Sequence, residues 1–427
     1  MLEAGPQGRA LVVDLDFRSR HSDEVCAVDF TSYLAEELPA RLAGRNGELA
    51  LRGLRYLELA PLALEVEGRA FTFVGTDGSV EVRAGAREAQ AVAVLDAGAF
   101  SDLVQDLRST MGLSLGNDVE MQRGAIDDFV EWEPVLRAMI DGRPVYEPGS
   151  VEFRAADGTP LDLDRRFTPE DDDAEIANFL SQAGFLRLGN WFTREEMAEV
   201  SADIDRALPG YAPEDGRSWW ASTASGARRA VRLQFFHEHS DRVRGLLGDA
   251  RLSRIAALSS NGHVAGSLED SNVVEALVKP LDVVEGISDL PWHKDCSLGR
   301  HSYRCAGITV GICVTDADRE TGELGVVAGS HRASVPPVGV HAKVDLPRVP
   351  LPSRAGDATV HLSCTLHMSR PPVRSERRVL YTGFGLPLRP GEVDVGAEKI
   401  SEIREGAPKR MGAESRDELG RVGSFDL

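Results

Sequence analysis

The stretch PWHKD at residues 291–295 decides how the rest of the chain is interpreted. Its His293 and Asp295 are two residues apart, and side chains with this spacing point to the same face of an extended strand. A second histidine, His367, ends the stretch GDATVHLSCTLH at residues 356–367. Two imidazoles and one carboxylate on one face of an octahedral ion leave three positions open, a ligand set typical of non-heme Fe(II) sites. We therefore expect neighbouring strands to bring these three side chains together around iron.

His361 is a rival for the second histidine ligand. It precedes His367 by six residues, an even offset, so both imidazoles would face the same side of a straight strand. Spacing alone leaves the choice between them open.

Further motifs keep the order of a known family. WHKD at 292–295 is followed by ETGELGVVAGSH at 320–331, by GD at 356–357, and by Arg378, eleven residues after His367. Upstream, GFLRLGNWFTREEM at 184–197 has the form of a strand that leads into a capped helix. In these features, residues 173–390 resemble the phytanoyl-CoA dioxygenase family of Fe(II)/2-oxoglutarate oxygenases.

The resemblance implies a mostly β catalytic domain, a double-stranded β-helix (jelly roll, cupin-like) with flanking helices. It also implies Fe(II) as the metal and 2-oxoglutarate as the cosubstrate. His293, Asp295 and His367 then ligate the metal. The GD pair and the arginine eleven residues downstream favour His367 over His361, which becomes a neighbour of the site or a core residue.

By the same resemblance, Arg378 binds the far carboxylate of 2-oxoglutarate. A planar guanidinium forms two parallel hydrogen bonds to a carboxylate, which a lysine cannot reproduce. Arg377, which would point the opposite way on a strand, and Arg374 are alternatives. Thr309 and Lys279 are further candidates for contact with the cosubstrate.

Asp295 bears on the type of reaction. Halogenating relatives carry glycine or alanine at this position, so a carboxylate points to hydroxylation, or to desaturation, ring closure or epimerisation. We expect a dioxygenase that oxidises an unactivated C–H bond of a small, hydrophobic or carrier-linked metabolite, with O2 consumed and succinate and CO2 released. The alternatives are a non-catalytic binding protein of the same family and a cupin-type metal enzyme that does not use 2-oxoglutarate.

The rest of the chain is expected to divide into three parts. Residues 1–150 predict a smaller α+β accessory domain, residues 151–172 a linker, and residues 396–427 a tail beyond the catalytic domain at 173–395. Within the first part, alternating apolar residues predict strands at 48–54, 56–66, 71–74, 80–83 and 91–95. A helical apolar pattern follows over 129–140.

This order of elements resembles sterol-carrier-protein-2-like domains, which enclose an apolar tunnel. The resemblance implies that apolar side chains of the strands line such a tunnel: Leu62, Leu64, Val66, Phe71 and Phe73. A filled core in an ordinary accessory domain is the alternative.

Composition excludes several classes of partner. The formal net charge of −20 repels nucleic-acid phosphates and anionic membrane surfaces. No run of 18 apolar residues predicts a membrane span. Five cysteines without a CxxC pair suggest free thiols in a reducing compartment, so we expect a cytoplasmic protein. The oligomeric state is not indicated by the sequence.

Overall fold

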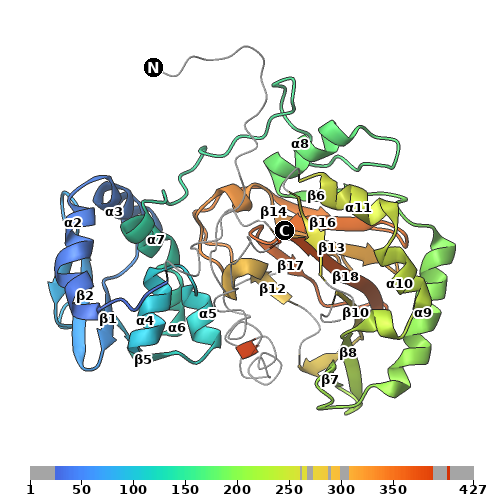
Figure 1. Ribbon diagram of the computed structural model, residues 1–427, viewed down its shortest axis with the longest axis horizontal. Coiled ribbons are helices and arrows are strands. Elements are labelled where there is room, and N and C mark those ends of the chain that lie inside the picture. Colours follow the sequence, from blue (N-terminus) through green and yellow to red (C-terminus); the bar gives the residue numbers. More distant parts are fainter. Residues whose placement is uncertain are drawn as a thin grey trace.

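The computed structural model describes residues 25–259, 262–266, 273–286, 290–298, 307–387 and 402–403. These residues form two lobes, an N-terminal one drawn in blue to teal and a larger one drawn in green to red (Figure 1). Apart from residues 402–403, the predicted tail lies outside the described residues.

A five-stranded sheet forms one layer of the N-terminal lobe, in the order β3-β2-β1-β4-β5. Neighbouring strands are antiparallel except β1 and β4, which are parallel. The strands are β1 (Leu62–Val66), β2 (Arg69–Gly75), β3 (Val80–Ala84), β4 (Ala91–Leu95) and β5 (Val119–Arg123).

Short helices form the remainder of this α+β lobe. In chain order they are α1 (Phe30–Ser32), the π-helix η2 (Tyr33–Glu37), α2 (Leu38–Leu42), α3 (Arg45–Leu57), α4 (Ala97–Val104), α5 (Thr110–Leu115), α6 (Ile126–Val130) and α7 (Glu133–Asp141). The predicted helix at 129–140 is thus found as the end of α6 and α7, and Gly142 ends it in a left-handed conformation (φ 67°).

The strand predicted at 48–54 is wrong, because these residues lie inside helix α3. Leu49, Gly53 and Leu57 are buried at helical spacing and form one face of α3. The segment contains strong helix formers and no β-branched residue, so the alternation of leucines misled the prediction.

The apolar strand residues expected to line a tunnel lie in the core of this lobe. Leu62, Leu64, Val66 and Phe73 are at most 3% exposed and belong to one hydrophobic cluster together with side chains of α3, α4 and α7. Phe71 packs against the same cluster from its edge. A sterol-carrier-like role stays a prediction.

Two antiparallel sheets build the larger lobe. Within the described residues, one follows the order β11-β7-β8-β10-β18-β13-β16-β6, with β9 beside β18, and the other the order β12-β17-β14-β15. The larger sheet comprises β6 (Phe185–Leu188), β7 (Ser218–Thr223), β8 (Arg228–Leu233), β9 (Val264–Ala265), β10 (Val274–Lys279), β11 (Val283–Glu285), β13 (Ile308–Cys313), β16 (Ala358–Leu362) and β18 (Arg377–Gly385). The smaller sheet comprises β12 (Leu290–His293), β14 (Leu324–Val327), β15 (Arg348–Leu351) and β17 (His367–Ser369). The two sheets form the predicted jelly roll.

Helices flank the larger sheet, as Figure 1 shows. They are α8 (Asp173–Ala183), α9 (Arg194–Ala207), α10 (Asp241–Leu247) and α11 (Ala250–Ala257). Thr193 caps α9 in a capping box with Glu196, as its sequence predicts. Apolar side chains of these helices and of both sheets share one large core.

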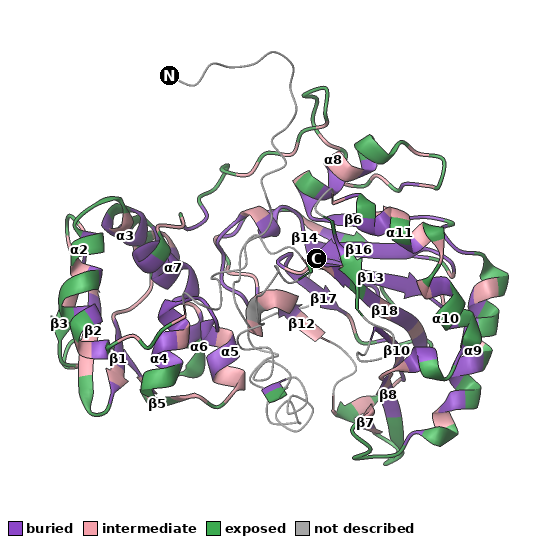
Figure 2. Cartoon of the chain, in the orientation of Figure 1, coloured by how far each residue is buried: buried purple, intermediate pink, exposed green. Residues whose placement is uncertain are grey.

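The small sheet has two different faces. Trp292, Leu366 and Met368 point to one side and belong to a separate apolar cluster, which also contains Tyr146. Since successive strand residues alternate, His293 and His367 point to the other side. Figure 2 shows β17 as buried and β12 as mainly of intermediate burial.

The stretch 151–172 carries no helix or strand of its own but is not detached. Phe167 is 1% exposed, belongs to the large core, and forms a bridge to Leu188 of β6. Val151 and Phe153 pack against the apolar cluster behind the small sheet.

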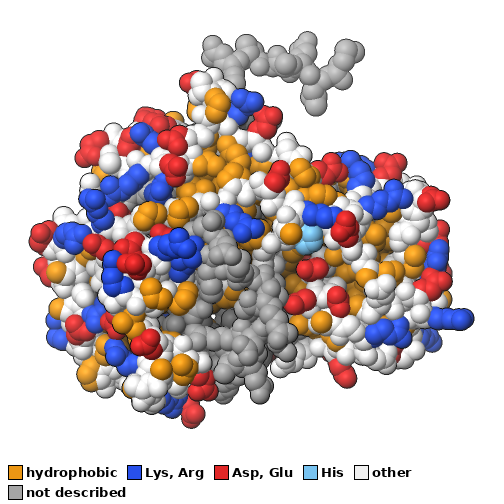
Figure 3. All heavy atoms as spheres, turned by 180° about the vertical axis from the view of Figure 1, so that it is seen from behind, with side chains coloured by type: hydrophobic (Ala, Val, Ile, Leu, Met, Phe, Trp, Pro, Cys, Tyr) orange, Lys and Arg blue, Asp and Glu red, His pale blue; other side chains and the backbone are white. Residues whose placement is uncertain are grey.

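Acidic and basic side chains are interspersed with apolar ones over the face shown in Figure 3. Among the described residues, no helix is both long enough and apolar enough to span a membrane.

Candidate metal centre

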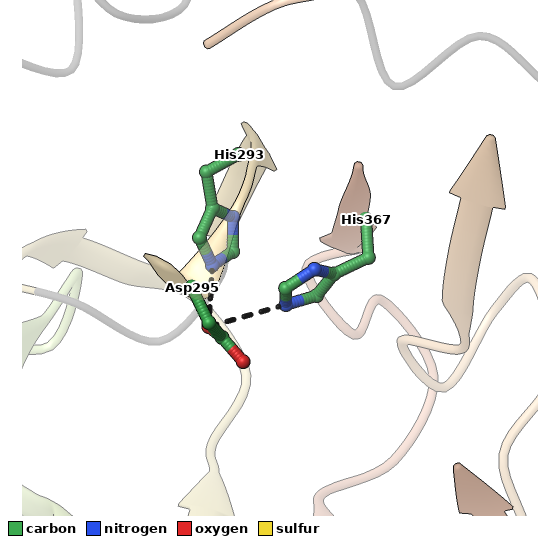
Figure 4. Close-up of side chains that lie close together, drawn as sticks. All are labelled: His293, Asp295 and His367. Atoms are coloured by element: carbon green, nitrogen blue, oxygen red, sulfur yellow. Dashed lines mark ion pairs between the residues drawn. The ribbon is translucent and has the colours of Figure 1, made fainter. Parts of the chain in front are cut away.

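Three side chains meet between the two sheets. His293 ends β12, His367 begins β17 directly opposite, and Asp295 begins the short 3-10 helix η5 (Asp295–Leu298). One ligand atom from each of these residues lies within 4.8 Å of the other two, and the carboxylate points toward both imidazoles (Figure 4). The segments joined at this point are the ones that the sequence predicted.

The donor atoms converge closely. Oδ1 of Asp295 lies 3.5 Å from Nε2 of His293 and 3.5 Å from Nε2 of His367. The two imidazole rings have centroids 4.2 Å apart. Two Nε2 atoms and one carboxylate oxygen at this spacing form the facial set that suits Fe(II).

Backbone carbonyls fix the orientation of both imidazoles. Nδ1 of His293 lies 2.7 Å from the carbonyl oxygen of Pro291, and Nδ1 of His367 lies 3.0 Å from that of Thr365. A carbonyl only accepts hydrogen bonds, so each Nδ1 carries the proton and donates it. Each Nε2 is then left with a lone pair that faces the other ligands, which is the tautomer a metal requires.

The second oxygen of the carboxylate is held by the larger sheet. The Thr309 hydroxyl donates to Oδ2 of Asp295 at 3.0 Å, and Nε2 of His361 lies 3.2 Å from the same oxygen. Thr309 and His361 are directly opposite each other on β13 and β16. Their contacts occupy Oδ2 and leave Oδ1 to face the histidines. Thr309, predicted to contact the cosubstrate, thus donates to the Asp295 carboxylate, and His361 contacts the same oxygen.

The electrostatics match a metal site. Burial raises the pKa of Asp295, but His367, His293 and His361 outweigh it and hold that pKa well below its ordinary value. Burial, together with the neighbouring His361 and His293, lowers the pKa of His367 well below its usual range. These directions favour the ionised form of Asp295 and the neutral form of His367, which are the forms that bind a metal ion.

The Arg378 side chain points away from His293, Asp295 and His367. Its side chain reaches the outer face of the larger sheet, where it donates to Ser201 Oγ of α9 at 2.9 Å and to Glu376 at 2.9 Å. It also pairs with Asp205 of α9 at 2.7 Å. Arg374 is exposed and pairs with Asp318 and Glu320.

Arg377 points between the sheets instead. It is 1% exposed and donates to the carbonyl of Gly322 at 2.6 Å and to Ser369 Oγ at 3.1 Å. Lys279, 4% exposed and directly opposite Arg377, donates to the same hydroxyl at 2.5 Å. Sequence reasoning missed Ser369, although its place two residues after His367 puts it on the same strand face.

Both cations donate to Ser369, which stands two residues after the candidate ligand His367. Ser369 and His367 share one face of β17, and two residues along a strand cover roughly 6.6 Å. A five-carbon dicarboxylate can span this distance, with one end at the metal group and the other at Arg377 and Lys279. The lysine that the sequence singled out is thus placed near the site.

A jelly roll that holds two histidines and one carboxylate between its sheets has the architecture of a non-heme iron enzyme. The family model "Phytanoyl-CoA dioxygenase (PhyH)" matches residues 180–379. This part of the chain is similar to the phytanoyl-CoA dioxygenase family, whose cofactors are Fe(II) and 2-oxoglutarate. No curated protein sequence matches the chain.

Several solved structures are similar over about half of the chain. AviO1 from Streptomyces viridochromogenes Tue57 is 25% identical, with 52% of this chain and 98% of AviO1 covered and a TM-score of 0.41. The epimerase SnoN, solved with Fe3+, alpha ketoglutarate and nogalamycin RO, is 20% identical over 49% of this chain and 81% of its own (TM-score 0.38). EctD from S. alaskensis is 16% identical over 57% and 83% (TM-score 0.42).

Proposed function

We propose that this protein is an Fe(II)- and 2-oxoglutarate-dependent dioxygenase that hydroxylates, or otherwise oxidises, an unactivated C–H bond of a small metabolite. Similarity to the phytanoyl-CoA dioxygenase family supports an oxygenase in general terms. The observation that carries the proposal for this chain is the convergence of His293, Asp295 and His367 within 4.8 Å. Iron, with 2-oxoglutarate and O2, supplies the oxidising power, and 2-oxoglutarate is converted to succinate and CO2.

The chain's own residues hold and orient the reactants. His293 and His367 present Nε2 because backbone carbonyls hold their Nδ1 protons. Asp295 presents one oxygen because Thr309 and His361 hold the other. Such outer contacts fix the direction of the ligands before a metal binds, so little reorganisation accompanies binding.

Arg377, rather than Arg378, is the residue we assign to the far carboxylate of 2-oxoglutarate. The Arg377 hydrogen bonds given above go to neutral groups, and its Nε has no hydrogen-bond partner among the described residues. Lys279, directly opposite, adds a second positive charge. Like charges directly opposite on neighbouring strands repel each other, and a bound carboxylate would relieve that repulsion.

The presence of Asp295 favours oxygen chemistry over halogenation, because the carboxylate fills the position that a halide would need. From the sequence we expect a substrate that is small and either hydrophobic or carrier-linked. We also expect, from the sequence, that the protein is cytoplasmic.

The test measures succinate after the protein is mixed with Fe(II), 2-oxoglutarate and O2. We expect succinate from the wild type even without the substrate, through slow uncoupled turnover, and none from Asp295→Ala. Equal succinate release by the wild type and by Asp295→Ala would show that succinate formation does not depend on this site. No release by the wild type, with pooled candidate substrates added, would refute the proposal.

A further inference from the structure

The N-terminal lobe contacts the chain segment that carries two of the three metal-ligand candidates. This segment runs from Leu290 to Leu298 and comprises β12 and η5. It is held on one side by helix α5 and on the other by a strap, which we define as residues 333–346. Helix α5 belongs to the N-terminal lobe, and residues of the same lobe bind the strap.

The first contact joins helix α5 to η5. A Cβ atom at Gly112 of α5 would lie 2.0 Å from the carbonyl oxygen of Leu298 and 2.8 Å from its carbonyl carbon. Such an approach is possible only without a side chain, and the obstacle is backbone, which cannot rotate away. Gly112 thus sets the distance between α5 and the helix that begins at Asp295.

Helix α5 is itself firmly attached to the N-terminal lobe. The backbone N–H of Thr110 donates to the buried carboxylate of Glu133 at 2.7 Å, and its hydroxyl donates to the carbonyl of Val130 at 3.3 Å. Leu113 is fully buried in the core of the lobe. Because η5 packs on α5, and α5 is anchored in the N-terminal lobe, the lobe fixes the position of η5.

The second contact runs through the strap, which lies beside β12. Val338 forms an antiparallel bridge with His293. The N–H of Lys294 donates to the Pro337 carbonyl at 3.2 Å, and the N–H of Gly339 donates to the Trp292 carbonyl at 2.9 Å. The strap therefore pairs with the backbone on both sides of His293.

The N-terminal lobe holds this strap at both ends. At one end, the N–H of Tyr146 donates to the Ser334 carbonyl at 3.0 Å. At the other, the Tyr146 hydroxyl bonds to Asp345 and the Tyr56 hydroxyl donates to the Lys343 carbonyl. The rings of both tyrosines pack with the apolar cluster behind the small sheet.

We propose that the N-terminal lobe is a positioning element of the metal site, in which Gly112 and the pair Tyr56 and Tyr146 fix the segment that carries His293 and Asp295. The proposal rests on the metal site of the proposed function and not on the reaction catalysed there. The N-terminal lobe then supports the metal site whether or not the lobe itself also binds a small molecule.

The test uses Gly112→Ala in the full chain, with Co(II) as a probe whose visible absorption depends on its coordination geometry. We expect the Co(II) dissociation constant to rise by roughly 10- to 100-fold, as after loss of other outer supports of metal ligands. The Co(II) spectrum should also change. Gly78→Ala in the β2–β3 turn is the matched control, because its added Cβ meets nothing within 4 Å.

Tyr56→Phe/Tyr146→Phe provides an independent variant in case Gly112→Ala does not fold. It keeps both rings and removes only the hydroxyl contacts to the strap. We expect weaker Co(II) binding and an altered spectrum, with the far-ultraviolet circular dichroism of the wild type. Folded variants with wild-type Co(II) affinity and spectrum would overturn the inference. A wild type that binds no Co(II) would instead remove its premise, the metal site itself.

Discussion

The Thr309 hydroxyl donates a 3.0 Å hydrogen bond to the carboxylate oxygen of Asp295 that faces away from His293 and His367. Thr309 belongs to the larger sheet, whereas the two histidines belong to the smaller one. This hydrogen bond therefore connects a candidate metal ligand to the opposite sheet. It also leaves a single carboxylate oxygen directed at the ligands.

Thr309→Val removes this hydrogen bond and keeps the shape of the side chain. We expect Fe(II) affinity to fall by roughly 10- to 100-fold, because the carboxylate loses a partner that orients it. Anaerobic Fe(II) titration measures the change. Thr309→Ser, which keeps the hydroxyl, should restore most of the affinity, and equal losses in both variants would contradict the role of the hydroxyl.

His361 and His367 are expected to respond differently to removal. His367→Ala should abolish turnover, since it removes a ligand atom, whereas His361→Ala should keep a measurable fraction because it removes contacts to Asp295 and to the His367 ring but no ligand atom. Succinate formation compares the two variants. An active His367→Ala beside an inactive His361→Ala would show that the distal ligand is misassigned.

Arg377 and Arg378 provide a matched pair of neighbours. Arg377→Gln should weaken 2-oxoglutarate binding by roughly 30-fold or more, the equivalent of at least about 2 kcal/mol for a buried charge pair. Arg378→Gln should leave it within about threefold of the wild type, because the partners of Arg378 are Glu376 and residues of α9. Calorimetric titration with 2-oxoglutarate measures both, and the reverse order would return the role to Arg378.

Glu196 makes stability depend on pH. Two hydrogen bonds from Arg251, at 2.8 and 3.0 Å, are the main cause that lowers the pKa of Glu196 from 4.5 to about 2. Because the pKa is lower in the folded state, the stabilisation is complete above pH 4.5 and is lost as pH falls toward 2.

Glu196→Gln should therefore reduce the free energy of unfolding by about 1–3 kcal/mol at pH 7. The difference from the wild type should shrink below pH 4.5. Urea denaturation from pH 7 to pH 3 measures it, and the exposed neighbour Glu195→Gln is the control for loss of a charge in the same helical turn. A difference that does not change with pH would contradict the ion pair as its source.

Much of the site could be predicted because its chemistry is tied to local spacing. His293 and Asp295 are two residues apart, and the distal histidine stands in a recognisable motif. Long-range pairing was the unpredictable part. Nothing local in the sequence shows that Thr309 and His361 meet across two strands and share one carboxylate oxygen.

The choice between Arg377 and Arg378 for the 2-oxoglutarate carboxylate depends on a register difference of one residue. Motif spacing singled out this arginine, but the register of β18 turns Arg377 inward and Arg378 toward α9. A shift of one residue exchanges the two faces of a strand, and spacing counted from a distant motif does not fix that register. The strand predicted at 48–54 is wrong because leucines spaced along a helix also alternate locally.

Chelation of the metal by 2-oxoglutarate is tested most directly by the visible absorption of the Fe(II)-loaded protein during anaerobic titration with 2-oxoglutarate, because chelation produces a charge-transfer band. We predict a band that saturates at one 2-oxoglutarate per chain in the wild type, is absent from His367→Ala, and needs far more cosubstrate in Arg377→Gln. A wild-type protein that binds Fe(II) but develops no band with 2-oxoglutarate would contradict the account.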